Sequence, residues 1–167
     1  MRDADADARI ADAVAVLQQD VGEWDVEMEI RPGPGAEPIR VTATATNRLV
    51  GGRWLIVDHL ADSGFEGHGI YGWDDAKRKY VGSWVDSMQT AIARSEGDWD
   101  PSTKTMTLTV EANHDGRSVG YREVTEHRDD GTTVYHNLVP TPDGSELEMI
   151  TATYRRRPDA SAPPPQV

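Results

Sequence analysis

The stretch "VGEWDVEMEI", Val21 to Ile30, decides the fold class because it alternates apolar and acidic side chains directly after a glycine. Successive side chains of a strand point to opposite faces. The apolar side chains on one face would be Trp24, Val26, Met28 and Ile30. Carboxylates on alternate residues of the other face stand ~7 Å apart and do not converge on a cation. The stretch therefore predicts a strand with one face lining or closing a barrel and the other face in water.

The residues before this strand have the spacing of an amphipathic helix. Ile10, Val14 and Leu17 recur at intervals of four and three, which places them on one helical stripe. Gly22 suits the end of such a helix. We expect a helix from Asp5 to Gln19 that covers one barrel mouth, with these three apolar side chains pointing inward.

After Gly22 the chain reads as about ten short strands joined by glycine-bearing turns, with no further helix. Regular short strands of this kind predict a sandwich or an up-and-down barrel. A barrel is favoured because several strands carry Thr, Glu or His among apolar residues, the mixed lining that a ligand requires. The sequence thus predicts an all-β antiparallel barrel with one N-terminal helix. Residues 1–157 would form a single domain, followed by a disordered, proline-rich tail at 158–167.

Composition narrows the function. The 167 residues carry a formal net charge of −12 and include no cysteine. A nucleic-acid partner is disfavoured because phosphates require clustered Lys and Arg, and thiol chemistry is excluded. The first residues lack the pattern of a secretion signal, and no apolar run approaches the ~20 residues of a membrane span. We expect a cytoplasmic protein with no membrane partner, and the sequence leaves open a homodimer.

Several ordered motifs resemble a known family. Gly22-x-Trp24 after a short helix resembles the lipocalin-type start, in which the tryptophan closes one barrel end and a basic residue of the last strand packs over it. The resemblance makes Arg155 that basic residue. The segments "LVGGRWL", "FEGHGIYGWDDAKRKYVGSWVDS", "GDWD" and "TATYRR" resemble a bacterial family of lipocalin-like domains of unknown function, over most of residues 14–156. One departure is Gly72-Trp73, where glycine and tyrosine would be expected. The resemblance implies a calycin-type barrel and no established reaction.

Two hairpins predict a polar face. If Asp130-Gly131 forms a two-residue turn, the residues on its two strands can be paired without a structure. The predicted pairs are His127 with Val134, Thr125 with His136 and Glu123 with Leu138. A second turn at Asp143-Gly144 extends this face to a third strand. The face would then hold Tyr121, Glu123, Thr125, His127, Val134, His136, Leu138, Met149, Thr151 and Thr153. The opposite face, with Arg122, Glu126, Arg128, Glu146 and Glu148, would be the exterior.

Two further pairs are candidates. With Ser63-Gly64 as a two-residue turn, His59 and His68 would stand opposite each other, about 5 Å apart. With a three-residue turn, His59 would face Gly67 instead. Trp84 and Asp86 share a face, one strand period apart. Asp86 would be either a buried acid or base, or the cap of the adjacent turn.

Three functions fit these patterns. The first is a barrel that binds a small, largely apolar molecule. The predicted ligand-binding residues are Trp54, His59, His68, Trp84, Trp99, Tyr121, Thr125, Tyr135, Leu138, Met149 and Thr151. The second is a cofactor-free isomerase or cyclase that moves a proton on a bound metabolite. Its predicted catalytic residues are His127, His136, Glu123 and Asp86. The third is haem binding through one of the five histidines. No metal site and no other cofactor is predicted, and the polar face could instead only fill the barrel.

Overall fold

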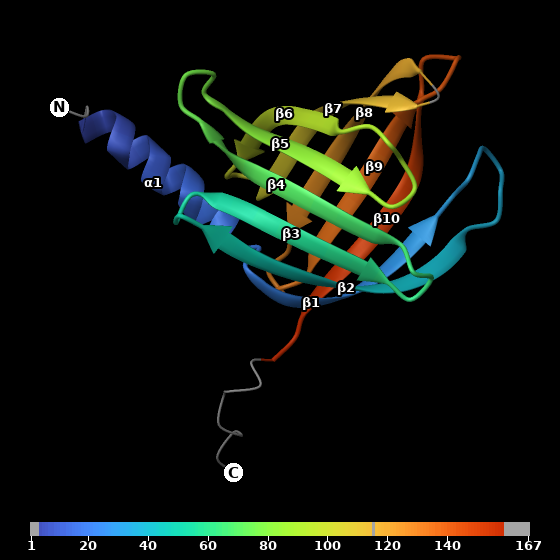
Figure 1. The fold of residues 1–167 in the computed structure, drawn as a ribbon, viewed down its shortest axis with the longest axis horizontal. Helices are drawn as coiled ribbons and strands as arrows, with labels where there is room; N and C mark the ends of the chain where they lie inside the picture. The colour runs from blue at the N-terminus through green and yellow to red at the C-terminus, as the bar shows by residue number, and fades with distance from the viewer. Residues whose placement is uncertain (1–3, 115, 159–167) are drawn as a thin grey trace, which may run out of the picture.

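A computed structural model describes residues 4–114 and 116–158, and within them it shows a closed barrel of ten strands preceded by one helix (Figure 1). The elements are α1 (Ala4–Gln18), β1 (Gly22–Ile30), β2 (Ile39–Val50), β3 (Trp54–Ala61), β4 (Glu66–Asp74), β5 (Lys79–Asp86), β6 (Ala93–Asp100), β7 (Thr105–His114), β8 (Arg117–His127), β9 (Thr133–Pro140) and β10 (Glu146–Arg156). Each strand pairs antiparallel with the next, and β1 pairs with β10 to close the sheet. The predicted up-and-down barrel with one N-terminal helix is confirmed.

Two sequence-based expectations concern the ends of the chain and membranes. Apart from Pro158, the predicted tail lies outside the described residues. Among the described residues, no helix is long and apolar enough to cross a membrane.

The alternation of β1 sets the inner and outer faces of the barrel. Trp24 and Val26 are 3% and 1% exposed, whereas the alternating acidic residues Glu23, Asp25 and Glu27 lie at the surface. Small partners make room for the large side chains: Trp24 stands opposite Ala45 of β2, and Met28 stands opposite Ala152 of β10. On the outer face, Glu27 forms an ion pair with Arg155. The opening strand therefore has the two faces that its sequence predicts.

Arg156, and not Arg155, packs over Trp24. Its guanidinium carbon lies 4.2 Å from the centre of the Trp24 ring, a cation–π contact. The β1–β10 register is the reason. Trp24 pairs with Arg156, so the adjacent Arg155 points outward. Arg156 also donates a hydrogen bond of 2.7 Å to the carbonyl oxygen of Gln19 at the end of the helix.

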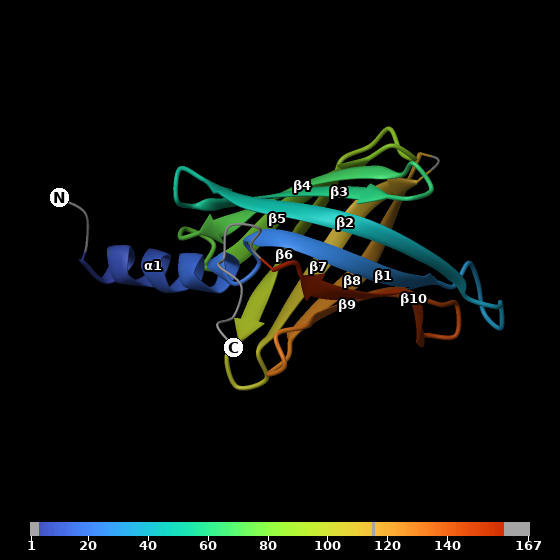
Figure 2. The ribbon, with the colours of Figure 1, turned by 90° about the horizontal axis from the view of Figure 1, so that it is seen from below.

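The C-terminal half of α1 closes one end of the barrel. In Figures 1 and 2 this half lies against the barrel, while the N-terminal end of the helix projects away from it. Ala13 and Leu17 are buried in a cluster with Leu55, Tyr80 and Leu108. Just beyond the helix, the carbonyl oxygen of Asp20 accepts hydrogen bonds from Trp24 Nε1 (2.9 Å) and Asn47 Nδ2 (2.8 Å).

The expectation for the inward stripe of the helix is only partly met. The helix begins and ends one residue before the predicted bounds. Of the three residues expected inside, only Leu17 is fully buried, and Ala13 is the helix's other buried residue. Ile10 and Val14 instead line a shallow surface pocket beside Gly52 of the β2–β3 turn. Because the helix lies across the rim, only its last turns reach the interior.

Truncation of the buried helix residue tests this closure. Leu17→Ala should lower the free energy of unfolding by ~2–5 kcal/mol, because it removes a buried side chain and leaves a cavity. Urea denaturation followed by circular dichroism measures the change. Gln18→Ala at the exposed neighbouring position is the matched control. Equal stability of the two variants would contradict a helix that closes the barrel.

Candidate functional site

The turn between β8 and β9 decides which side chains face the barrel interior. The Arg128 amide donates to the Thr132 carbonyl (2.9 Å) and the Gly131 amide to the Arg128 carbonyl (3.1 Å), so the loop is longer than two residues. The Asp130 carboxylate supports this longer turn by accepting hydrogen bonds from the amide (2.9 Å) and the hydroxyl (2.6 Å) of Thr132. The predicted two-residue turn is therefore wrong.

The longer turn shifts the pairing by one residue. The observed pairs are Glu123 with Asn137, Thr125 with Tyr135 and His127 with Thr133. The β8 residues of the predicted face point inward, as predicted. The β9 and β10 residues of that face point to the opposite side of the sheet. The side chains that consequently take the outward strand phase are Val134, His136, Leu138, Thr151 and Thr153, of which Val134 is still buried at 3% exposed. On the outer face, the His136 ring contacts the carboxylate of Glu148.

The second hairpin was predicted more closely. His136 stands opposite Thr151 and Val134 opposite Thr153, as predicted. The predicted two-residue turn is nevertheless wrong, because the Thr141 amide donates to the Ser145 carbonyl (2.8 Å) and the Gly144 amide to the Thr141 carbonyl (3.0 Å). Near this longer turn Leu138 pairs with Glu148 and not with Met149, and the shift of the β10 register between Glu148 and Ile150 then restores the predicted pairs. Met149 lies at this β-bulge, so its predicted place beside Leu138 is also wrong.

A carboxyl, a phenol and an amide meet in the barrel interior. The Tyr135 hydroxyl donates a 2.8 Å hydrogen bond to Glu123 Oε1, and Asn137 Nδ2 donates to the Tyr135 oxygen at 3.4 Å. Among the described residues, Glu123 Oε2 accepts no hydrogen bond, and the buried Oδ1 of Asn137 has no partner. Burial raises the pKa of Glu123 to about 7, although the hydrogen bond from Tyr135 opposes the rise. The cluster thus offers two oxygen acceptors without donors.

Three more tyrosines surround this carboxyl. Burial and the nearby charge of Glu123 raise the pKa of Tyr71, Tyr121 and Tyr154, so all three phenols are neutral at physiological pH. Their side chains point inward yet are only half-buried. Space for the Tyr71 ring comes from glycine, since an added Cβ at Gly82 would collide with it.

His59 and Trp84 form the wall nearer the end opposite α1. The Ala61 amide donates to the Phe65 carbonyl (2.9 Å) across a turn longer than two residues, and His59 consequently faces Gly67. The predicted His59–His68 pair is therefore wrong, and the alternative register holds. The Trp84 ring lies over Gly67, where an added Cβ would collide with it. Burial lowers the pKa of His59, which favours its neutral form.

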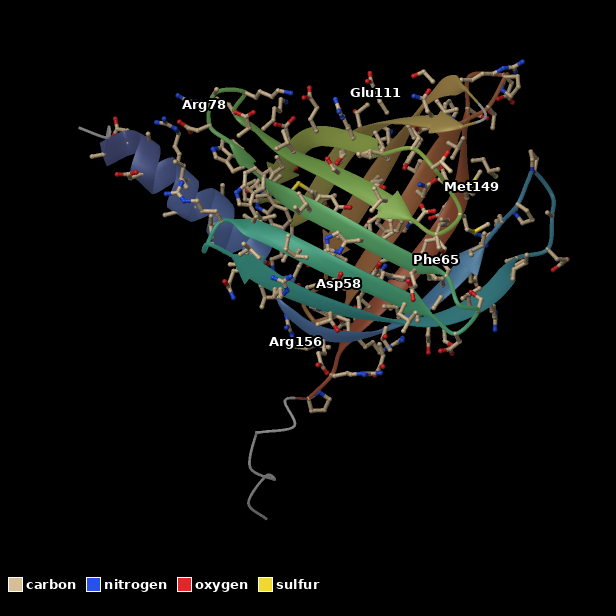
Figure 3. All side chains as sticks on the ribbon, viewed as in Figure 1. Asp58, Phe65, Arg78, Glu111, Met149 and Arg156 are labelled. Carbon is tan, nitrogen blue, oxygen red and sulfur yellow. The ribbon has the colours of Figure 1, made fainter. Side chains whose placement is uncertain are left out.

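Asp86 and His68 have separate roles outside the central cluster. Trp84 Nε1 donates to Asp86 Oδ2 (3.0 Å), so the two share a face as their spacing predicts. The other oxygen of Asp86 accepts the Met88 amide (2.9 Å) and caps the turn after β5. His68 points outward and contacts Asp58, with 2.5 Å between Nδ1 and Oδ1. Figure 3 shows Asp58 on the outer side of β3.

The remaining predicted residues lie elsewhere. Trp54 is 41% exposed and covers Gly72 from the outside, so it does not line the interior. His127 does point inward, but at the end closed by the helix, where its Nε2 lies 2.8 Å from Asp20 Oδ1. Its ring packs against Trp99, with ring centres 5.2 Å apart. Thr125, two residues before His127, also faces inward. The structure therefore separates Glu123 from both histidines proposed as its catalytic partners.

Sequence reasoning missed three members of the interior cluster. Tyr71 and Tyr154 share the inward phase of Leu55 and Trp24, which strand alternation alone could have indicated. The inward position of Asn137 follows from that of Tyr135, two residues earlier on the same strand, but the inward face of this strand is known only once the length of the β8–β9 turn is known. Within the described part of the chain, no group of three or more metal-ligating side chains occurs.

The raised pKa of Glu123 predicts how stability depends on pH. Below about pH 4.5 the carboxyl is protonated in both states, so the folded protein bears no penalty. Between about pH 4.5 and about pH 7 the unfolded chain ionises first, and stability is lost. The difference amounts to about 3 kcal/mol in unfolding free energy.

Urea unfolding across this pH range measures the loss. Glu123→Gln should remove it, because the amide does not ionise. Glu111→Gln, which removes an exposed carboxylate from the outer side of β7 (Figure 3), is the matched control and should retain the loss. Parallel curves for wild type and Glu123→Gln would contradict a buried, neutral carboxyl.

Comparison with known proteins places the chain in a family. Residues 11–156 match the family described as "Protein of unknown function (DUF1579)". The crystal structure of Rv2717c from M. tuberculosis superposes with a TM-score of 0.67 at 11% sequence identity, and the match covers 87% of this chain and 98% of that chain. At this identity the likeness shows a shared fold alone. No curated protein matches the chain. The chain belongs to the DUF1579 family of proteins of unknown function.

Proposed function

We propose that the barrel interior binds a small, largely apolar molecule whose polar group contacts Glu123, Tyr135 and Asn137. The observation that carries the proposal is the Glu123 carboxyl, which is held inside the barrel with a pKa of about 7 and one oxygen that accepts no hydrogen bond from the described residues. A carboxyl that is largely removed from water, with no charged partner among the described residues, costs stability. Groups perturbed in this way cluster at functional sites.

The inner surface supports the same proposal. Aromatic rings and apolar side chains make up most of it, and a few polar groups converge at one depth, which is the usual composition of a small-molecule site. The Trp84 and Tyr71 rings lie over bare glycine backbone, and the side chains of Tyr121 and Tyr154 point inward and are only partly buried. The Trp24–Arg156 contact at the closed end also supports a lipocalin-like assignment for the barrel.

A neutral fluorescent probe tests binding in the interior. N-phenyl-1-naphthylamine should bind the wild-type protein saturably, with increased emission. Ser95→Phe should weaken this binding by about tenfold or more, because Ser95 points inward beside Gly82 and the new ring would occupy the interior. Arg94→Phe places the same side chain on the outer face and is the matched control. Equal probe affinity of the two folded variants would contradict an interior site.

Acid–base catalysis is the second candidate function. A carboxyl with a pKa near neutrality can both take up and release a proton at physiological pH, and the Tyr135 hydroxyl fixes its orientation. An isomerase or cyclase reaction at Glu123 would need no cofactor.

Deuterium labelling tests this second function. The wild-type protein, incubated with a metabolite extract in heavy water, should introduce carbon-bound deuterium into a specific compound, as detected by mass spectrometry. Glu123→Gln should abolish the labelling, whereas Glu111→Gln should leave it unchanged. Labelling that persists in Glu123→Gln would exclude Glu123 as the catalytic acid or base.

A further inference from the structure

We propose that the bound molecule is a protonated amine on an apolar skeleton, with its ammonium group held between the Glu123 carboxylate and the surrounding tyrosine rings. This inference rests on the proposed function and names the ligand class of that site. It follows from the charge balance, the hydrogen-bond balance and the aromatic lining of the interior.

The charge balance of the interior is negative. Within the described strands, the carboxylates on the inward face belong to Glu123 and Asp86, and the inward-phase arginines, Arg117 and Arg156, stand at exposed strand ends. Figure 3 places Arg156 at the end of the barrel that carries α1. Its guanidinium packs on Trp24 and donates to backbone carbonyls. An anionic ligand group would therefore meet Glu123 without a counter-ion, which a buried charge requires.

The hydrogen-bond balance also favours a donor. Tyr135 donates its single hydroxyl proton to Glu123 Oε1. Glu123 Oε2 and the buried Asn137 Oδ1 then remain as acceptors for which the described residues supply no donor. Asn137 is only 8% exposed and stands opposite Glu123 across the β8–β9 pair. An ammonium group carries donors and no acceptor, so it complements this arrangement.

The aromatic lining suits a cation. Tyr121 lies two residues before Glu123 on the same face of β8, and Tyr154 of β10 and Tyr71 of β4 face the same interior. Neutral aromatic faces attract a cation within about 6 Å of the ring centre, and the attraction is stronger where water is excluded. A carboxylate combined with several tyrosine rings therefore offers an organic cation both charge neutralisation and contact area.

Proton linkage gives the proposal a distinct pH dependence. Below about pH 7 much of the free protein carries a protonated Glu123. A bound ammonium group favours the carboxylate, so amine binding releases a proton and its affinity should rise as the pH passes through this value. A neutral ligand should not show this dependence, and an anionic one should bind more weakly as the pH rises.

A matched ligand series tests the inference. Decylamine, decanol and decanoate share one apolar chain. Each is tested in competition with the neutral probe, above pH 7, in physiological salt and at concentrations below those at which the ligand forms micelles. We expect decylamine to bind about tenfold tighter than decanol, and decanoate to bind weakest. Glu123→Gln should abolish the preference for decylamine over decanol, with both affinities measured on the same variant. Glu111→Gln should preserve the preference, which controls for attraction by the net charge of −12.

The outcomes separate this inference from the proposed function. If the probe and all three ligands fail to bind, the proposed function itself is wrong. If the probe and decanol bind but decylamine binds no tighter, or if decanoate binds best, the amine inference is overturned and interior binding stands. A decylamine preference that survives in Glu123→Gln would also overturn it, because the preference would then come from surface charge.

Discussion

The pairing of β1 with β10 is the constraint on which the rest of the structure depends. It closes the sheet, and closure leaves every strand with one face inside and one face outside. Trp24 fixes the phase at the seam, since its indole donates to the Asp20 carbonyl and its ring lies under Arg156. The same seam ties the end of the helix to the barrel.

A closed barrel of this kind places a polar cluster where water has little access. The Glu123 carboxyl lies among tyrosine rings, and its raised pKa reflects the free-energy cost of ionising a carboxyl that is removed from water. The helix adds to this isolation by filling one end with Ala13 and Leu17. Both proposed functions, ligand binding and proton transfer, rest on this one carboxyl, and the amine inference rests on the lack of a cationic neighbour among the described residues.

The histidines illustrate how far sequence patterns extend in this protein. His59 and His127 were placed on inward faces correctly, yet neither reaches the Glu123 cluster. His68 and His136 lie on the outer face beside Asp58 and Glu148. For His68 and His136, the turn is one residue longer than the dipeptide suggests, and this moves the side chain from the inner to the outer face. Side chains alternate along a strand, so a shift of one residue exchanges inside and outside.

The sequence by itself determined the helix, the antiparallel barrel and the inward phase of β1 and β8, because these depend on local periodicity and on turn-forming glycines. It also determined that Glu123 would face inward on β8. Only the tertiary structure decided the β8–β9 register, and with it the meeting of Glu123, Tyr135 and Asn137. The physical reason is that turn length here depends on side-chain hydrogen bonds such as those of Asp130. The pKa of Glu123, in turn, depends on burial by residues that are distant in sequence.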